Sequence, residues 1–100
     1  MTMTMTAPAR EPEVIEREWT RLLPPYRVLI HDDPIHTYHE VALAVHQTVP
    51  GKSYADGWAI ATLVDTTGQA IAAIGPKEVA EHYRERFEHV YGLTSTIEPV

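Results

Sequence analysis

Residues 26–34 read YRVLIHDDP, which places an apolar run directly before a polar turn. Apart from one arginine, residues 26–30 are aromatic, aliphatic or β-branched, and such residues favour the extended backbone of a strand. Pro25 precedes the run, and His-Asp-Asp-Pro at 31–34 follows it with residues that favour turns. The stretch therefore predicts a buried β-strand over residues 26–30.

Two capping boxes predict two helices after this turn. Thr37 stands three residues before Glu40, and Ser53 stands three residues before Asp56. At this spacing the two side chains of each pair hydrogen-bond the free N–H groups at a helix start. The first helix carries apolar residues on one face and is expected to end at about Thr48, before a Pro-Gly pair.

Glycine marks further boundaries. Gly57 should weaken the second helix by about 1 kcal/mol relative to alanine, so this helix is expected to depend on tertiary packing. Gly68 is expected to end it, because glycine adopts positive φ at low cost. The short apolar segment 69–74 follows and predicts a second strand at the centre of a sheet.

A third helix is expected after Gly75 and Pro76, because proline at a helix start loses no hydrogen bond there. The side chains expected on its buried face are Val79, Tyr83, Phe87 and Val90. Gly92 then ends the helix. Apolar and hydroxyl residues alternate over 93–97, which predicts a third strand.

Together these elements predict one α+β domain over residues 25–100. The order β-α-α-β-α-β suits a small three-stranded antiparallel sheet with the helices packed on one face. Residues 1–24 begin with a Met-Thr repeat and are predicted to form a flexible extension. Within it, apolar residues at near-helical spacing predict a short helix over 13–23, which the following prolines would end.

The composition excludes several classes of function. A chain of 100 residues leaves little room for a large cofactor site, and a net charge of -6 disfavours binding to nucleic acid or to an anionic membrane. The absence of cysteine excludes disulfides, thiol catalysis and cysteine-bound zinc, and agrees with a reducing compartment. No apolar run approaches the roughly 20 residues of a membrane-spanning helix. We therefore expect a cytoplasmic protein without a cofactor.

Several short strings, in their order and spacing, resemble the ClpS adaptor family over residues 24–100. The strings are YRVLI at 26–30 followed by HDD, VPG at 49–51, GQAI at 68–71, EVAE at 78–81 and STIEP at 95–99. The resemblance implies an adaptor and not an enzyme. Such an adaptor holds the free amino terminus of a substrate and seats its bulky apolar first side chain in a pocket. It also docks on the amino-terminal domain of a Clp ATPase of the ClpA or ClpC type.

The resemblance also implies which residues hold the amino group. In the family this group is held by an Asn-Asp pair after the first strand and by a His that ends the second helix. Asp32 matches the family aspartate, His31 stands where asparagine is usual, and Asp65 stands where the histidine is usual. We expect these three residues to bind the ammonium group, which needs converging acceptors with negative charge. The alternative is that they are ordinary turn and helix-end residues.

The apolar pocket is expected at four positions that match or neighbour family pocket positions: Val41, Ala61, Val64 and Leu93. Ala61 stands where the family often has a larger methionine, so a wider pocket that admits β-branched or larger first residues is expected. The alternative is that all four are ordinary core residues.

The expected docking surface for the ATPase contains Glu78 and Glu81, which belong to the EVAE string at the start of the third helix. The helix dipole gives an independent reason for acidic residues at a helix start. The partners implied are therefore the ATPase domain and substrate amino-terminal peptides.

Two other functions remain open. One is a ClpS-like module that has lost degron recognition and binds other proteins. The other is a metal-binding protein or hydrolase, because histidines and aspartates crowd residues 31–39: His31, Asp32, Asp33, His36 and His39. The turn at Pro34 leaves the directions of these side chains unconstrained, which argues against a metal site. We expect no enzyme, since no serine lies in a nucleophile elbow and the sequence has no glycine-rich phosphate loop.

Overall fold

The structure is a computed structural model, and it describes residues 23–100. Residues 1–22, which hold the extension predicted over 1–24 and the helix expected over 13–23 except for their last one or two residues, lie outside this range. The described elements follow the predicted order β-α-α-β-α-β: β1 (Tyr26–His31), α2 (Tyr38–Thr48), α3 (Tyr54–Thr67), β2 (Gln69–Gly75), α4 (Lys77–His89) and β3 (Thr94–Pro99).

Strand β1 is the centre of the three-stranded sheet, whose order is β2-β1-β3. It pairs antiparallel with both neighbours, so that Val28 lies opposite Ala73 on one side and Ile97 on the other. The register with β2 shifts after Val28, and Ala72 is the additional residue of this bulge. The prediction that the second strand is central was wrong. The strand with the continuous buried run, residues 28–30, takes the centre and pairs along both of its edges.

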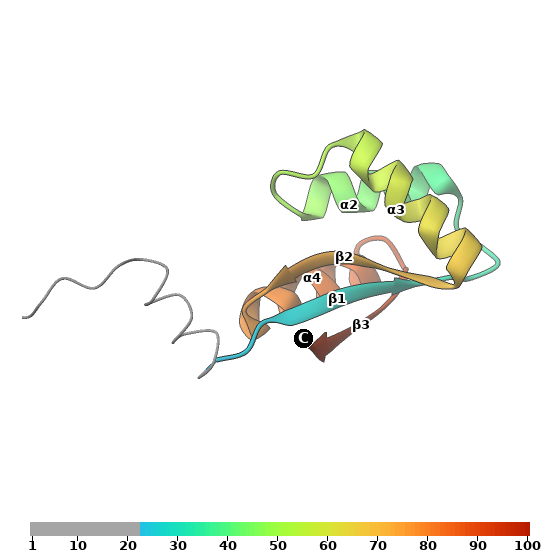
Figure 1. Ribbon diagram of the computed structural model, residues 1–100. Helices are drawn as coiled ribbons and strands as arrows, with labels where there is room; N and C mark the ends of the chain where they lie inside the picture. Colours follow the sequence, from blue (N-terminus) through green and yellow to red (C-terminus); the bar gives the residue numbers. More distant parts are fainter. Residues whose placement is uncertain (1–22) are drawn as a thin grey trace, which may run out of the picture.

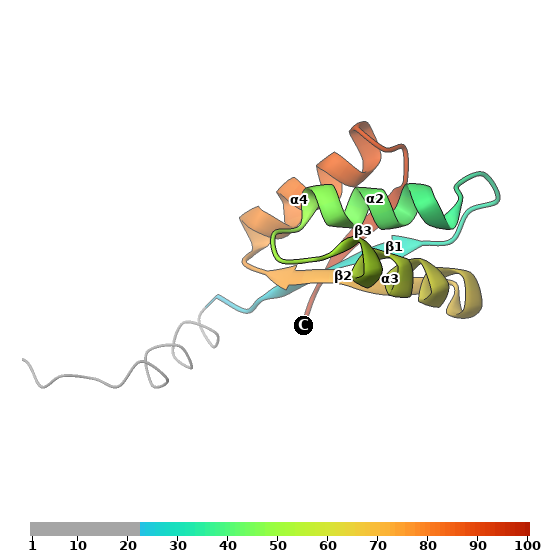
Figure 2. The same cartoon turned by 90° about the horizontal axis from the view of Figure 1, so that it is seen from above.

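The three helices share one hydrophobic core with a single face of the sheet. Val28 and Ile30, two residues apart on β1, point to the same face and are fully buried. Their core includes side chains from every helix, among them Val45 of α2, Val64 of α3 and Phe87 of α4. Helix α2 contacts both of the other helices and lies between them (Figures 1 and 2). The predicted fold class is therefore confirmed. Across residues 23–100, none of the helices combines the length and the apolar character that crossing a bilayer requires.

Both predicted capping boxes are present. The side chain of Thr37 accepts from the N–H of Glu40, whose carboxylate accepts from the N–H of Thr37. Ser53 and Asp56 make the same reciprocal pair at the start of α3. Helix α3 ends where predicted, with Gly68 in the left-handed region at φ 92°.

The buried face of α4 differs from the prediction. Ala80 and Phe87 are its buried residues, whereas Val79 is 38% exposed and Val90 is 58% exposed. Tyr83 is half-buried. Val79 was misassigned because a helix turns 100° per residue, so the small neighbour Ala80 takes the position closest to the sheet. Val90 lies beyond the last helical residue and no longer follows the buried face.

Helices α2 and α3 pack at close range because Gly57 has no side chain. A Cβ atom built on Gly57 would lie 2.8 Å from the Cα of Ala42 and closer still to its carbonyl oxygen. Both contacts are to backbone atoms, which cannot move aside as a flexible side chain can. The glycine that lowers the intrinsic stability of α3 therefore allows the packing on which this helix depends.

Replacement of Gly57 by alanine should lower the free energy of unfolding by about 1–3 kcal/mol, because the added methyl group pushes the two helices apart. Intrinsic helix propensity alone predicts the opposite sign, a gain of about 1 kcal/mol. Urea denaturation of the variant and of wild type measures the difference. Ala59→Gly on the exposed face of α3 is the control and should cost about 1 kcal/mol by propensity. A stabilised Gly57→Ala variant would show that the close contact is not limiting.

Candidate functional site

One backbone hydrogen bond brings the end of β1 to the end of α3. The N–H of Asp32 donates to the carbonyl oxygen of Gly68 at 2.9 Å, which extends the pairing of β1 with β2 by one residue. Asp65 lies three residues before Gly68, in the last turn of α3. Two acidic side chains that are 33 residues apart in the sequence are therefore placed at the same corner of the fold.

A cavity of about 340 Å³ opens at this corner, and we call it the acidic cavity. Asp32 and Asp65 border it together with three apolar residues on α2 and α3: Val41, Ala61 and Val64. The remaining residues around it belong to the loop 33–37 and the start of α2: Asp33, Pro34, His36, Thr37 and Tyr38. The acidic pair is exposed whereas the three apolar residues are buried, so the cavity joins a charged rim to an apolar floor.

Tyr38 connects the two acidic residues. Its hydroxyl donates to Oδ2 of Asp65 at 2.5 Å. The pKa of Tyr38 is raised by this hydrogen bond first, and also by burial and by the negative charges of Asp65 and Asp32. Oδ2 of Asp65 is therefore held beside the phenol group at the start of α2, and the charge of Asp32 acts on the same group.

Two of the expected site residues lie elsewhere. The ring of His31 does not border the acidic cavity, and its Nε2 lies 2.7 Å from Oγ1 of Thr96 on β3. Side chains alternate along a strand, so His31 points to the face opposite that of Ile30 and away from the helices. Leu93 also does not border this cavity, because it is 2% exposed and packs in the core just before β3. Strand alternation therefore decides the placement of His31, and core packing decides that of Leu93.

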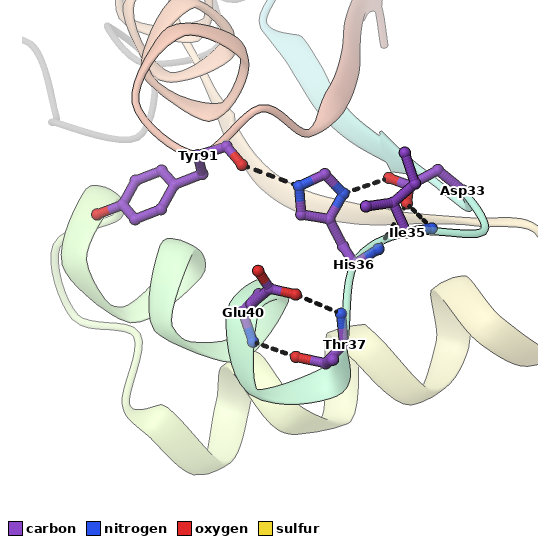
Figure 3. Close-up of polar contacts among 6 residues, drawn as sticks. All are labelled: Asp33, Ile35, His36, Thr37, Glu40 and Tyr91. Carbon is purple, nitrogen blue, oxygen red and sulfur yellow. Dashed lines mark hydrogen bonds and ion pairs between the residues drawn. The ribbon is translucent and has the colours of Figure 1, made fainter.

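The loop that leads into α2 is held by a polar network around His36 (Figure 3). Oδ1 of Asp33 accepts from the backbone N–H groups of Ile35 and His36, both at 2.8 Å. Oδ2 of Asp33 lies 2.8 Å from Nδ1 of His36, and Nε2 of His36 lies 3.0 Å from the carbonyl oxygen of Tyr91. The His36 ring thus ties the loop beside the acidic cavity to the segment between α4 and β3.

Both ring nitrogens of His36 face acceptors. The ring therefore bridges the carboxylate of Asp33 and the carbonyl oxygen of Tyr91. Burial alone would raise the pKa of Asp33, but the N–H groups of His36 and Ile35 and the His36 ring together hold it below its usual value. Both oxygens of the Asp33 carboxylate therefore already hold hydrogen bonds within the loop. Asp32 and Asp65 are the acidic residues of the cavity that remain available to a ligand.

The expected docking residues lie at the start of α4. Glu78 borders a second cavity of about 690 Å³, whose lining is mainly apolar. The other residues around this cavity are Leu23, Pro24, Tyr26, Pro76, Lys77 and Val79. Glu81 follows one turn later, with its Oε1 3.9 Å from Nζ of Lys77. Tyr26 begins β1 and Asp32 follows its end, so the two cavities lie at opposite ends of a strand that spans roughly 20 Å.

The residues of the metal hypothesis do not converge. His36 is held by Asp33 and Tyr91, and Nδ1 of His39 lies 2.8 Å from the hydroxyl of Tyr54. Within residues 23–100, no group of three or more histidine and carboxylate side chains is arranged to hold a metal ion.

Comparison with known proteins gives one consistent family. The family model described as the ATP-dependent Clp protease adaptor protein ClpS matches residues 22–96. The ATP-dependent Clp protease adapter protein ClpS of a Nostoc strain is 33% identical over 89 residues, which cover 89% of this chain and 91% of that protein. Its counterpart from a Synechococcus strain is 37% identical over 76 residues, which cover 76% of this chain and 72% of that protein.

A plant relative and a solved structure agree with this pattern. The chloroplastic adapter protein CLPS1 of Arabidopsis thaliana is 28% identical over 94 residues, which cover 94% of this chain and 58% of that protein. The structure of Agrobacterium tumefaciens ClpS2 bound to L-phenylalaninamide matches with a TM-score of 0.70 over 76% of this chain and 96% of that one. The identity in this match is 17%, so it shows a shared fold.

Loss of the Asp33 charge should destabilise the chain in a pH-dependent way. Because the folded pKa lies below the unfolded value of about 3.9, the contribution of Asp33 is complete above that value and is lost as the pH falls through the folded pKa. We expect Asp33→Asn to lower the free energy of unfolding by about 1–2 kcal/mol at pH 7, and the difference from wild type to shrink below about pH 4. Urea denaturation at several pH values measures both quantities. A difference that stays constant down to pH 3 would argue against a stabilising contribution from the Asp33 carboxylate charge.

Proposed function

Because the chain belongs to the ClpS family of ATP-dependent Clp protease adaptors, we propose that it performs this adaptor role by binding the free amino terminus of substrates. The family consists of adaptors and not of enzymes, which agrees with the sequence analysis. We further propose that residues 25–100 are the adaptor domain and that the bound substrate is handed to the amino-terminal domain of a ClpA-type or ClpC-type ATPase in the cytoplasm.

The observation that carries the proposal is that two carboxylates border one cavity together with buried apolar side chains. Asp32 and Asp65 border the same cavity, and both influence Tyr38. A protein amino terminus presents an ammonium group on the same carbon atom as its first side chain. Charged acceptors beside an apolar hollow match both parts of this ligand at once.

Charge is the main source of selectivity in this proposal. Hydrogen bonds between an ammonium group and carboxylates are stronger than neutral ones, and the chain carries a net charge of -6 that attracts a cation. An internal peptide segment has a neutral amide in place of the ammonium and gains neither effect. The site would therefore distinguish the start of a chain from its interior.

The apolar floor would receive the first side chain. Val41, Ala61 and Val64 are buried side chains around a volume of about 340 Å³, which is at the small end of the usual range for ligand pockets. This volume suits one side chain with its ammonium group. The small side chain of Ala61 leaves room for a β-branched or aromatic first residue.

The docking part of the proposal is supported by the position of Glu78. It borders the apolar cavity at the start of β1, whereas the acidic cavity lies at the end of that strand. An ATPase domain bound at one end would leave the other end free for the substrate.

A second candidate function is a protein-interaction module that no longer recognises degrons. The orientation of His31 favours it, because this ring lies against Thr96 and one of the three expected acceptors is absent from the acidic cavity. Such a module would still dock on the ATPase but would not respond to a free amine.

Amino-group recognition has a direct test. We expect L-phenylalaninamide to bind the chain in isothermal titration calorimetry, and its N-acetyl derivative to bind at least about tenfold more weakly, because acetylation removes the positive charge. Asp32→Asn and Asp65→Asn should each weaken binding of the free amine by about tenfold or more. Glu85→Gln removes the same charge from an exposed site on α4 and should leave the affinity unchanged. Equal binding of the two ligands would refute the proposal.

The docking surface is tested separately. We expect Glu78→Lys to weaken binding to a purified ClpA or ClpC amino-terminal domain by about tenfold or more, because it reverses a charge in the proposed interface. Its affinity for L-phenylalaninamide should not change, since the acidic cavity lies at the far end of β1. Glu85→Lys is the matched control for the change in net charge. Unaltered docking of Glu78→Lys would place the ATPase on another surface.

A further inference from the structure

An ammonium group has three N–H donors, and a buried ammonium needs an acceptor for each of them. In the acidic cavity the carboxylates of Asp32 and Asp65 supply two of these acceptors. The third was expected from His31, but its ring lies against Thr96 on the opposite face of the sheet. A further acceptor on the rim of the cavity would satisfy the third N–H of the proposed ligand.

Tyr38 is a residue of the rim with a polar atom directed at the acidic pair. Its hydroxyl hydrogen is donated to Oδ2 of Asp65. A phenol has only one hydrogen to donate, so the lone pairs of the same oxygen remain available to accept a hydrogen bond. The raised pKa of Tyr38 keeps this phenol protonated and in the donating state at neutral pH.

The Tyr38 ring is held in place from two directions. It is the first residue of α2 and directly follows Thr37, whose reciprocal hydrogen bonds with Glu40 fix the start of this helix. Trp58 of α3 packs edge-on against the ring with a centroid distance of 5.3 Å. These contacts fix the position of the hydroxyl in the absence of a ligand, so Tyr38 loses little conformational freedom on binding.

We propose that the phenolic oxygen of Tyr38 is the third acceptor for the substrate ammonium group. It would take the acceptor role that the sequence analysis expected of His31. This inference rests on the proposed function. Its consequence is a narrower substrate class: the site selects primary ammonium groups, which have three donors. Amino-terminal proline and N-methylated amino termini have only two and would leave one acceptor without a partner.

The test compares L-phenylalaninamide with N-methyl-L-phenylalaninamide by titration calorimetry. Wild type should bind the primary amine about tenfold or more tightly. Tyr38→Phe, which keeps the ring and removes the hydroxyl, should weaken binding of the primary amine by a similar factor and bring the ratio of the two affinities close to one. Tyr83→Phe is the control, because it removes a hydroxyl from a half-buried tyrosine on α4 and should keep the wild-type ratio.

Two results would overturn the inference while the proposed function stands: a Tyr38→Phe variant that binds the primary amine as tightly as wild type, or one that binds both amines more weakly by the same factor. The second result would assign Tyr38 a purely structural role. If Tyr38→Phe does not fold, wild type alone decides, and less than about threefold discrimination against the N-methyl amine overturns the inference. Failure of wild type to bind either amine would overturn both the inference and the proposed function.

Discussion

The hydrogen bond from the N–H of Asp32 to the carbonyl oxygen of Gly68 is the contact on which the site depends. It can form because β1 is the central strand and because Gly68 ends α3 in a left-handed conformation that turns the chain directly into β2. Asp65 lies one helical turn before Gly68, so the same contact brings it to the cavity that Asp32 borders. Without this junction the two acids would belong to unrelated surfaces, and the apolar floor between α2 and α3 would have no charged rim.

In the proposed function, the fold separates the recognition site from the docking site without any moving part. Strand β1 is paired along both edges and carries the acidic cavity at its end and the Glu78 cavity at its start. An adaptor needs only to hold two partners at once, so a rigid strand between two surfaces is sufficient. The close packing of α2 and α3 at Gly57 keeps the floor of the acidic cavity in a fixed shape, and the His36 network does the same for the loop at its rim.

Features that depend on local sequence were predicted correctly, and those that depend on packing were not. Capping boxes and the glycine end of α3 involve residues at most a few positions apart, so Thr37, Ser53 and Gly68 revealed them. The central strand, the buried face of α4 and the close contact at Gly57 depend on partners far along the chain. The site divides in the same way. The family pattern pointed to Asp32 and Asp65, which border one cavity. The orientation of His31 away from that cavity follows from strand alternation once β1 is known to include it. Tyr38 gave no signal beyond its position after a helix cap.

The most direct measurement is a crystal structure of the chain with bound L-phenylalaninamide. The account predicts the ammonium nitrogen within about 3.2 Å of a carboxylate oxygen of Asp32 and of Asp65, with the phenyl ring seated among Val41, Ala61 and Val64. A ligand whose nitrogen points to solvent or to His31, or carboxylates of Asp32 and Asp65 that turn away from the cavity, would contradict it.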